Sequence, residues 1–203
     1  MKTRILPIIL IALTIVISNP IRAQIKGSGE LTKRTLNLEH FNAIEAGGAQ
    51  EVVLTNGDFY SVTIETNDNL HEYISYEIKN DRLRFKYNKI KNYDKMKFYI
   101  TAPEFNEVTI SGASELRSAE TIKGDNLKIY ASGASEANLK LDYSNLITKV
   151  SGASEIKLSG TVNSHIAEAS GASEIKSGDL KTQTTVISAS GASECFVNAE
   201  SNL

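Results

Sequence analysis

The chain has 203 residues, of which 41% are hydrophobic and 23% charged, and its formal net charge is −2 at pH 7. This length suits one ordinary domain with a buried core, and a slightly acidic chain is a poor candidate for nonspecific nucleic-acid binding, which requires a positive surface potential. Cys195 is the only cysteine. An internal disulfide is therefore excluded, so packing and backbone hydrogen bonds must stabilise the fold.

Residues 1–23 have the pattern of a secretory signal peptide. Lys2 and Arg4 precede an aliphatic run from Ile5 to Ile17, and Ala23 supplies the small residue expected before the cleavage point. A membrane-spanning helix needs roughly 20 apolar residues, which is more than this run supplies. We therefore predict export to the periplasm or the extracellular cell surface, with no stable membrane span after cleavage. Removal of this signal peptide lowers the formal net charge from −2 to −5, because it takes away three basic residues and no acidic one.

The mature chain is predicted to be one domain behind a short leader. Residues 24–33 are polar and contain two glycines, which is typical of a flexible segment. The domain itself spans residues 34–203 and begins with an aromatic-rich N-terminal half, residues 34–106, which holds eleven of the fourteen aromatic residues. Short runs of alternating apolar and polar residues there, separated by turns rich in Asn, Asp and Gly, predict β-strands.

Five copies of the pentapeptide Ser-Gly-Ala-Ser-Glu dominate the second half, residues 107–198. Their glycines are Gly112, Gly133, Gly152, Gly171 and Gly191, which follow one another at intervals of 21, 19, 19 and 20 residues. A period this regular is typical of a solenoid. The segment 46–51, Ala-Gly-Gly-Ala-Gln-Glu, resembles a degenerate sixth copy, and its Gly48 precedes the first repeated glycine by 64 residues, about three periods.

The five copies, aligned on their glycine, show the alternation of a half-buried strand on both sides of the turn. Positions two and four before the glycine and four after it are mostly apolar, with polar residues between them. A leucine-rich repeat would need a leucine frame that is missing here. We therefore predict an all-β, single-domain β-solenoid, a parallel β-helix of about nine coils of about 20 residues, with equivalent positions stacked about 4.8 Å apart.

The last residues of the pentapeptides form a column of carboxylates: Glu115, Glu136, Glu155, Glu174 and Glu194. Stacked carboxylates repel one another and could share Ca²⁺, a cation that prefers oxygen ligands. Alternatively, Arg117, Lys157 and Lys176 pair diagonally with these glutamates and leave a charge-neutralised face. The column is thus a candidate cation-binding ladder, and surface ion pairing is the simpler interpretation.

A second candidate site is basic and lies in the aromatic-rich half. Its cations are Arg82, Arg84, Lys86, Lys95 and Lys97, which are interleaved with aromatic residues. Such a surface can bind a polyanion, for example an anionic glycan. The alternation of these cations with Leu83 and Phe85 is also explained if they form the outer face of a strand.

No catalytic or metal-binding pattern accompanies these columns in the sequence. His40, His71 and His165 lack metal-ligand spacing, and no histidine recurs at a fixed offset from the repeated serines. The two serine ladders of the pentapeptide suit hydrogen bonds to the backbone of adjacent coils, or a sugar-binding surface. Cys195 falls in an apolar column, so we expect it to be a small buried hydrophobe. We predict no enzyme activity and no cofactor.

Several segments together resemble the auto-transporter adhesin head domain, called the GIN domain. They are Phe41-Asn42-Ala43-Ile44, the degenerate copy from Gly48 to Val52, and the segment Val108–Glu115 with its four echoes. The resemblance covers roughly residues 36–198. It implies a protein of the kind exported by Bacteroidetes, with a right-handed β-helix-like fold. The family has no established catalytic residues, so the resemblance assigns no site.

We therefore expect an exported, noncatalytic β-solenoid that acts as a binding module, with adhesion or glycan contact at the cell envelope and a glycan or an envelope protein as partner. Nucleic acid is not expected as a partner. One alternative is a glycan-active enzyme of the β-helix type. Another is a self-assembling structural element of the envelope, a homo-oligomer whose coil ends stack between molecules, because exposed solenoid edges favour pairing.

Overall fold

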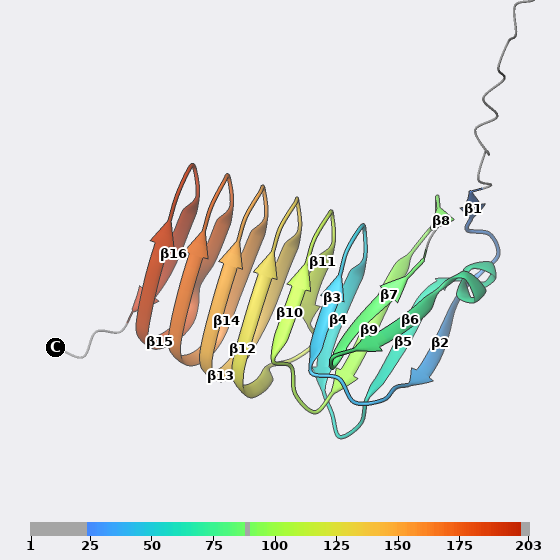
Figure 1. Ribbon diagram of the computed structural model, residues 1–203, viewed down its shortest axis with the longest axis horizontal. Coiled ribbons are helices and arrows are strands. Elements are labelled where there is room, and N and C mark those ends of the chain that lie inside the picture. The colour runs from blue at the N-terminus through green and yellow to red at the C-terminus, as the bar shows by residue number, and fades with distance from the viewer. Residues whose placement is uncertain (1–23, 88–89, 200–203) are drawn as a thin grey trace, which may run out of the picture.

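The structure, a computed structural model, describes residues 24–87 and 90–199, so the predicted signal peptide lies outside the described residues. Among the described residues strands make up 66% and helices 3%, which confirms the predicted all-β class. Figure 1 shows the coils side by side along the long axis of the molecule. Within the described ranges, no helix is both long and apolar enough to cross a membrane.

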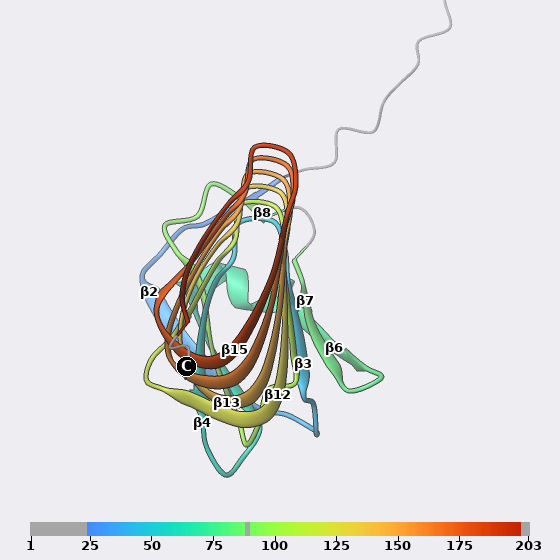
Figure 2. The ribbon, with the colours of Figure 1, turned by 90° about the vertical axis from the view of Figure 1, so that its left-hand side faces the viewer.

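Two walls form the solenoid, joined by a broad rounded base at one edge and by narrow turns at the other, as the end-on view in Figure 2 shows. The first wall, here called the glutamate wall, carries the predicted column of carboxylates. In spatial order its strands are β2 (Leu31–Asn37), β5 (Ser61–Asn67), β9 (Met96–Ala102), β4 (Glu51–Asn56), β11 (Glu115–Ser118), the first parts of β13 (Glu136–Val150), β14 (Glu155–Ala169) and β15 (Glu174–Ala189), and β16 (Glu194–Ala199). β5 runs antiparallel to β2 and β9, and the other neighbours are parallel.

The second wall is here called the tyrosine wall, after Tyr130 on its outer face. In spatial order its strands are β6 (Ser75–Lys79), β7 (Arg82–Lys86), β3 (Ala43–Ala46), β10 (Glu107–Ile110), β12 (Ile122–Ala131) and the last parts of β13, β14 and β15. Only β6 and β7 pair in antiparallel fashion among these strands. The long strands β13, β14 and β15 run along one wall, around the base and into the other wall, so each contributes to both.

Two short elements lie outside the walls. β1 (Ile25–Lys26) pairs with β8 (Ile90–Lys91), and a 3-10 helix, η1 (Asp68–Tyr73), follows β5. The segment 24–33, predicted as a flexible leader, therefore contains β1 and the start of β2. This part of the prediction is corrected. β2 is held by backbone hydrogen bonds to β5, and most of its side chains are exposed. The sequence therefore lacks the apolar alternation that would have predicted this strand.

The coils do not follow chain order in the N-terminal half. β3 lies between β7 and β10, and β4 lies between β9 and β11, so the earliest coil is inserted between two later ones. As a result Gly48 is directly stacked on Gly112, and the amide of Ala113 donates to the Gly48 carbonyl at 2.6 Å. The degenerate copy is thus a turn of the same stack. The expected three intervening periods are absent, because residues 57–106 fold at the end of the solenoid instead.

The solenoid has about five turns, so the predicted nine coils were wrong while the fold class is confirmed. The count of nine divided the whole domain by one period. Residues 57–86 instead form the antiparallel strands β5, β6 and β7 together with η1. These strands lengthen both walls without forming regular coils.

The pentapeptide forms the tight turn that joins the two walls. Its glycines adopt φ values from +73° to +78°, a left-handed conformation that L residues with a side chain rarely adopt. Successive turns are also bonded to each other, for example by the amide of Ala134, which donates to the Gly112 carbonyl at 2.8 Å. A Cβ atom on Gly133 would lie 2.8 Å from that same carbonyl oxygen. Only glycine allows the turns to stack this closely.

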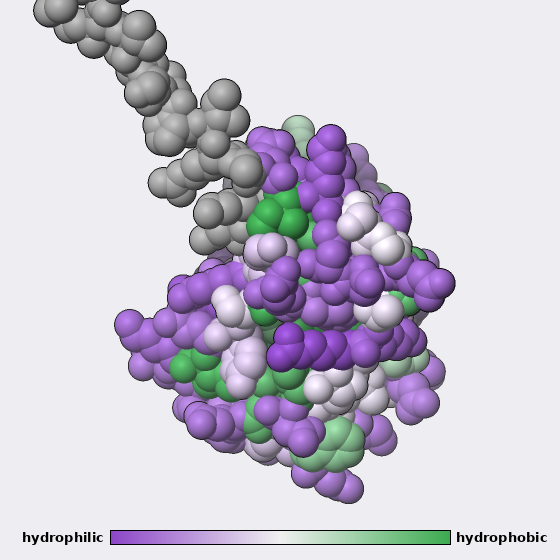
Figure 3. Space-filling model, turned by 90° about the vertical axis from the view of Figure 1, so that its right-hand side faces the viewer, coloured by the Kyte–Doolittle hydropathy of each residue, from purple (hydrophilic) through white to green (hydrophobic). Residues whose placement is uncertain are grey.

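The apolar columns predicted from the repeats point into one continuous core. Ile110, Ala131, Val150 and Ala169 are at most 4% exposed, and the column four positions after the glycine is equally buried through Ile175. The last copy differs, because Ile187 is 43% exposed and Cys195 is only half-buried. Fewer described strands cover this last coil. Figure 3 shows the opposite end of the molecule, whose surface is mostly hydrophilic with scattered hydrophobic patches, as expected of a solenoid cap.

Candidate functional site

The predicted basic surface is divided between the two walls. Arg82, Arg84 and Lys86 lie on β7 in the tyrosine wall, whereas Lys97 lies on β9 in the glutamate wall, just after Lys95. The structure therefore brings three of the five residues together and places the other two elsewhere. Lys97 is also only 5% exposed.

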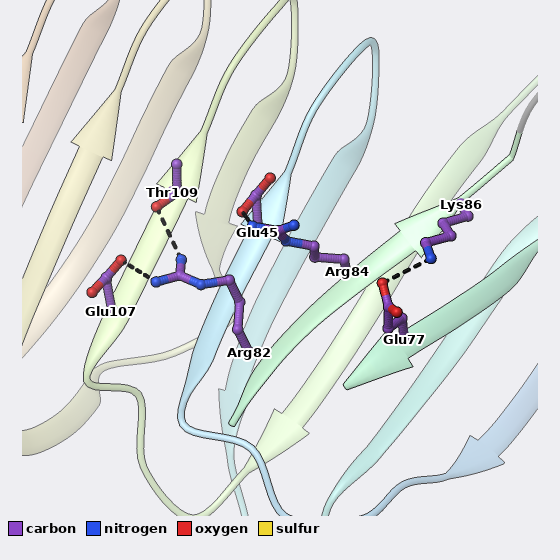
Figure 4. Close-up of polar contacts among 7 residues, drawn as sticks. All are labelled: Glu45, Glu77, Arg82, Arg84, Lys86, Glu107 and Thr109. Atoms are coloured by element: carbon purple, nitrogen blue, oxygen red, sulfur yellow. Dashed lines mark hydrogen bonds and ion pairs between the residues drawn. The ribbon is translucent and has the colours of Figure 1, made fainter. Parts of the chain in front are cut away.

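Each of these cations contacts a carboxylate. On β7, Arg82 pairs with Glu107 at 2.6 Å, Arg84 with Glu45 at 2.5 Å, and Lys86 with Glu77 at 2.7 Å (Figure 4). In the glutamate wall, Lys95 pairs with Glu65 at 3.0 Å and Lys97 pairs with Glu51. The cations on β7 are thus compensated by carboxylates on the neighbouring strands β10, β3 and β6.

The carboxylate column stacks in register along the glutamate wall, and Glu51 extends it by one coil. Lys176 bridges Glu155 at 2.8 Å and Glu174 at 2.9 Å, and these two carboxylates raise the pKa of Lys176 to about 12. Arg117 pairs with Glu51 at 2.8 Å. Two of the three predicted counterions therefore contact the column. Among the described residues, no group of three or more His, Cys, Asp or Glu side chains is arranged to hold a metal ion.

A row of polar residues crosses the outer face of the tyrosine wall, one from each strand at the same register. We call this row the polar track: Glu77, Arg84, Glu45, Thr109, Tyr130, Lys149, Glu168 and Ser188. Lys149 and Glu168 form an ion pair at 2.8 Å, and the carboxylate raises the pKa of the lysine. The track spans eight strands, so at one strand every 4.7–4.9 Å it is on the order of 30 Å long.

A hollow of about 430 Å³ lies along the repeat end of the polar track. We call it the serine groove, because the first serines of four pentapeptides line it: Ser132, Ser151, Ser170 and Ser190. Tyr130, Lys149, Glu168 and Ser188 of the track form its other side. The groove presents hydroxyl groups at intervals of one coil, an ion pair in its middle and one aromatic ring at its end.

A second hollow, of about 320 Å³, lies at the other end of the polar track. We call it the Gln50 hollow, and its lining residues include Glu45, Gln50, Glu77, Arg84 and Tyr87. The Tyr87 hydroxyl donates to the Gly47 carbonyl at 2.6 Å, and burial raises the pKa of Tyr87. Two strands, β3 and β10, separate β7 from the serine groove.

The sequence alone indicated the repeat end of the polar track. The repeat alignment places Thr109, Tyr130, Lys149, Glu168 and Ser188 in one outward polar column. It does not show that Glu45 continues the column, although Glu45 precedes Gly48 by the same three residues as Thr109 precedes Gly112. Aligning the degenerate copy with the five full ones would have extended the track. The position of β7 beside β3 could not have been predicted by this alignment, because β7 pairs antiparallel with β6 and carries no copy of the repeat.

The family to which the chain belongs follows from a comparison with known protein families. The family described as "putative auto-transporter adhesin, head GIN domain" matches residues 40–203. The chain belongs to this family. The resemblance stated from the sequence is thereby confirmed, and the family supports a noncatalytic, adhesion-like module that is exported or exposed at the surface.

Solved structures from Bacteroidetes share this GIN-domain fold. A Bacteroides fragilis protein described as a putative adhesin is 25% identical, has a TM-score of 0.80, and is matched over 86% of this chain and 83% of that chain. For a Parabacteroides merdae protein of the same description, the identity is 20%, the TM-score 0.74 and the coverages 87% and 85%. A Parabacteroides distasonis protein described as a putative lipid-binding protein is 17% identical, with a TM-score of 0.68 and the same coverages. No curated protein matches the chain.

Proposed function

We propose that this GIN domain is an exported, noncatalytic binding module that holds a linear glycan along its polar track at the cell envelope. The observation that carries the proposal is the serine groove. Its hydroxyls recur once per coil, and the coil spacing of about 4.8 Å is close to the length of one sugar ring in an extended chain. A linear polymer of sugars can therefore repeat its contacts in step with the protein.

The chemistry of the groove suits sugars. The serine hydroxyls both donate and accept hydrogen bonds, as sugar hydroxyls do, and few of these hydroxyls have strong partners in the protein. Ser151 and Ser170 contact carbonyls of the preceding coil only at 3.5 Å. The ring of Tyr130 offers an apolar face with a polar tip at one end of the groove. Lys149 and Glu168 add one donor and one acceptor group of opposite charge.

The arrangement supports binding over cleavage. Most glycosidases place two carboxyl groups on either side of the bond that they cleave. Within the described residues that line the serine groove, Glu168 provides the only carboxylate, and Lys149 is its partner. Incubation of the domain with the glycans that it binds is expected to release no new reducing ends. A release that is lost in Glu168→Gln would favour the enzyme alternative.

A glycan array of the purified domain tests the proposal. We expect binding to linear glycans and an about tenfold loss of affinity in Tyr130→Ala, the size of effect that loss of one aromatic contact produces. Tyr73→Ala is the matched control, because Tyr73 is 42% exposed on η1, away from the track. Absence of glycan binding by the wild type, or equal binding by Tyr130→Ala, would contradict the proposal.

The self-assembly alternative has one observation in its favour. Val186, Ile187 and Phe196 are 56%, 43% and 51% exposed at the last described coil, the first two in the tyrosine wall and Phe196 in the glutamate wall, so both walls end in exposed apolar side chains near a strand edge. Light scattering over a concentration series distinguishes the two functions. A mass that grows with concentration and returns to the monomer value in Phe196→Ser would support assembly, and a constant monomer mass would remove it.

A further inference from the structure

We infer that the Gln50 hollow receives the terminal sugar of the glycan, so that this GIN domain binds glycan chains by their end and in one direction. The inference rests on the proposed function and adds a second site to it. It begins from the one turn of the stack that departs from the repeat. In that turn, glycine replaces the first serine at Gly47, and glutamine replaces the second serine at Gln50.

The second serine of the full repeats has a structural role. In four of the five copies its hydroxyl donates to the carbonyl three residues earlier, at 2.8–3.0 Å, and these serines are Ser114, Ser135, Ser173 and Ser193. In the degenerate copy the equivalent carbonyl belongs to Gly47, and the Tyr87 hydroxyl bonds to it instead. Tyr87 thus replaces the serine hydroxyl, and the Gln50 side chain is not needed to close the turn.

Gln50 is nevertheless buried, with only 3% of its surface exposed, and it lines the hollow. Its Oε1 atom finds no hydrogen-bond donor in the described part of the chain. A buried polar atom without a partner is costly, and native structures contain few of them. A serine at this position would remove the cost. The presence of the longer glutamine side chain at position 50 is explained if a ligand supplies the missing hydrogen bond.

The walls of the hollow are held rigidly. A Cβ atom on Gly48 would lie 2.6 Å from the Tyr87 hydroxyl, so glycine is required for the ring to pack there. Phe85, which also lines the hollow, stacks on Phe98 with the ring centroids 4.2 Å apart. The volume of about 320 Å³ lies at the lower end of the range for small-molecule sites. The hollow is therefore formed before any ligand arrives.

The polar groups of the hollow select a polyhydroxyl ligand. Two ion pairs line it, Arg84 with Glu45 and Lys86 with Glu77, so it offers donors and acceptors in equal measure (Figure 4). A simple anion or cation would match only half of these groups. A sugar hydroxyl both donates and accepts, so it satisfies the Gln50 amide in either orientation of that group. Phe85 and Tyr87 supply the aromatic surface on which a sugar ring packs.

The position of the hollow makes it an end site. Glu45 and Arg84 belong to the polar track, which continues through Thr109 to the serine groove. Figure 2 shows that the β6–β7 hairpin projects away from the line of the coils at this end. A glycan that lies in the serine groove and follows the track therefore reaches the Gln50 hollow beside the hairpin, where the wall ends at its edge strand β6. Its last sugar enters the hollow, and the remaining sugars extend toward the repeats.

Isothermal titration calorimetry with oligosaccharides tests the inference. The probes are linear oligosaccharides of glucose, of N-acetylglucosamine and of a uronic acid, each with the hydroxyls of its non-reducing terminal sugar either free or methylated. For the sugar that the wild type binds, we expect the free end to bind about tenfold more tightly than the methylated one. Gln50→Met has nearly the same shape but no amide, and in this variant the two probes should bind equally. Gln183→Met is the matched control on an exposed glutamine of β15.

The variant separates binding from folding. Gln50→Met removes an unpartnered buried oxygen and also the side-chain hydrogen bond of Gln50 with Tyr87, so its unfolding temperature should stay close to that of the wild type. If Tyr130→Ala weakens binding while Gln50→Met keeps the wild-type preference for free ends, the end site is wrong and the proposed function stands. If the wild type binds none of the probes, both proposals fail together. Preference for the methylated end in the wild type would also overturn the end site.

Discussion

The two halves of this GIN domain build the same two walls by different means. In the repeat half each coil follows the previous one in chain order, and identical turns stack on one another through glycine carbonyls. In the N-terminal half the strands are out of order and partly antiparallel, yet Gly48 and Glu51 still stack in register with Gly112 and Glu115. Register along the wall is therefore kept by the turn, and continuity of the chain is not needed for it.

The interiors of the two halves also differ. The N-terminal half is filled by large rings such as Phe41, Phe98 and Phe105, all of which are fully buried. The repeat half has a thinner interior, in which aliphatic residues surround a few polar ones, including His165 and Thr148. We expect the wide half to tolerate loss of a side chain less well, and the thin half to be sensitive to charge and to turn geometry.

Loss of a ring from the wide half should have the largest effect. Phe98→Ala removes a fully buried ring that stacks on Phe85, and we expect the free energy of unfolding to fall by about 4 kcal/mol. Leu158→Ala in the repeat half should lower it by about 3 kcal/mol, because the cavity is smaller. Urea denaturation at one pH measures both. Equal losses would show that the two interiors are packed alike.

Acidification should act mainly on the thin half. His165 is buried and its Nε2 contacts the Thr148 hydroxyl at 3.1 Å. Burial lowers the pKa of His165 from 6.5 to about 4. The unfolded chain therefore takes up the proton first, so stability is lost as the pH falls from 6.5 towards 4, by about 3 kcal/mol when the loss is complete.

Unfolding followed between pH 7 and pH 4 checks this effect. His165→Leu is the test variant, because Leu146 occupies the same position on the neighbouring coil. The variant should keep most of the stability that the wild type loses in this range. His40→Leu, on an exposed histidine, is the control and should follow the wild type. A wild-type curve that is flat over this range would contradict the assigned cause.

Turn geometry should give the next effect. Gly133→Ala places a Cβ atom against the Gly112 carbonyl at φ +78°, and the left-handed backbone alone should lower the free energy of unfolding by about 2 kcal/mol. Gly178→Ala is the control, because a Cβ atom there meets no atom within 4 Å. Thermal unfolding compares the two variants. An unchanged midpoint in Gly133→Ala would mean that the turns do not stack as tightly as their hydrogen bonds imply.

The sequence predicted the repeat half far better than the N-terminal half, for physical reasons. Each position in the repeat recurs five times, so the polar and apolar columns could be read directly, and the walls, the turns and the carboxylate column follow from them. The N-terminal strands have no repeated partner in the sequence. Nothing in the residues of β3 indicates that it lies between β7 and β10, so the number of coils was overestimated.

The two parts of the candidate site also differ in how far the sequence predicts them. The serine groove is made of repeated positions and could be inferred as an outward column with a ladder of hydroxyls. The Gln50 hollow needs the hairpin of β6 and β7, whose residues lie 25 or more positions after Gln50 in the chain. Gln50 was visible in the sequence only as a departure from the repeat. Its role depends on Tyr87, which no spacing connects to it.

Neutralisation of the cations on β7 should have the smallest effect on stability, and it tests the predicted polyanion surface. Arg84 and Lys86 are each paired with a carboxylate at an exposed face, where ion pairs contribute little to stability, and the Arg82–Glu107 pair is only partly buried. The triple change to glutamine should therefore lower the unfolding midpoint only slightly.

In the binding test the partner carboxylates Glu107, Glu45 and Glu77 are changed to glutamine as well, so that the face stays neutral and does not itself repel an anion. If the cations themselves hold an anionic glycan, binding of a uronic-acid oligosaccharide should be lost while neutral glycans still bind through the serine groove. If the cations serve only to neutralise their carboxylates, the loss of Arg84 from the Gln50 hollow should weaken the binding of neutral and anionic glycans equally. Binding of glycans that contact only the serine groove should be unaffected. The pairing in the structure leads us to expect the second result, and a loss confined to the anionic probe would restore the polyanion surface.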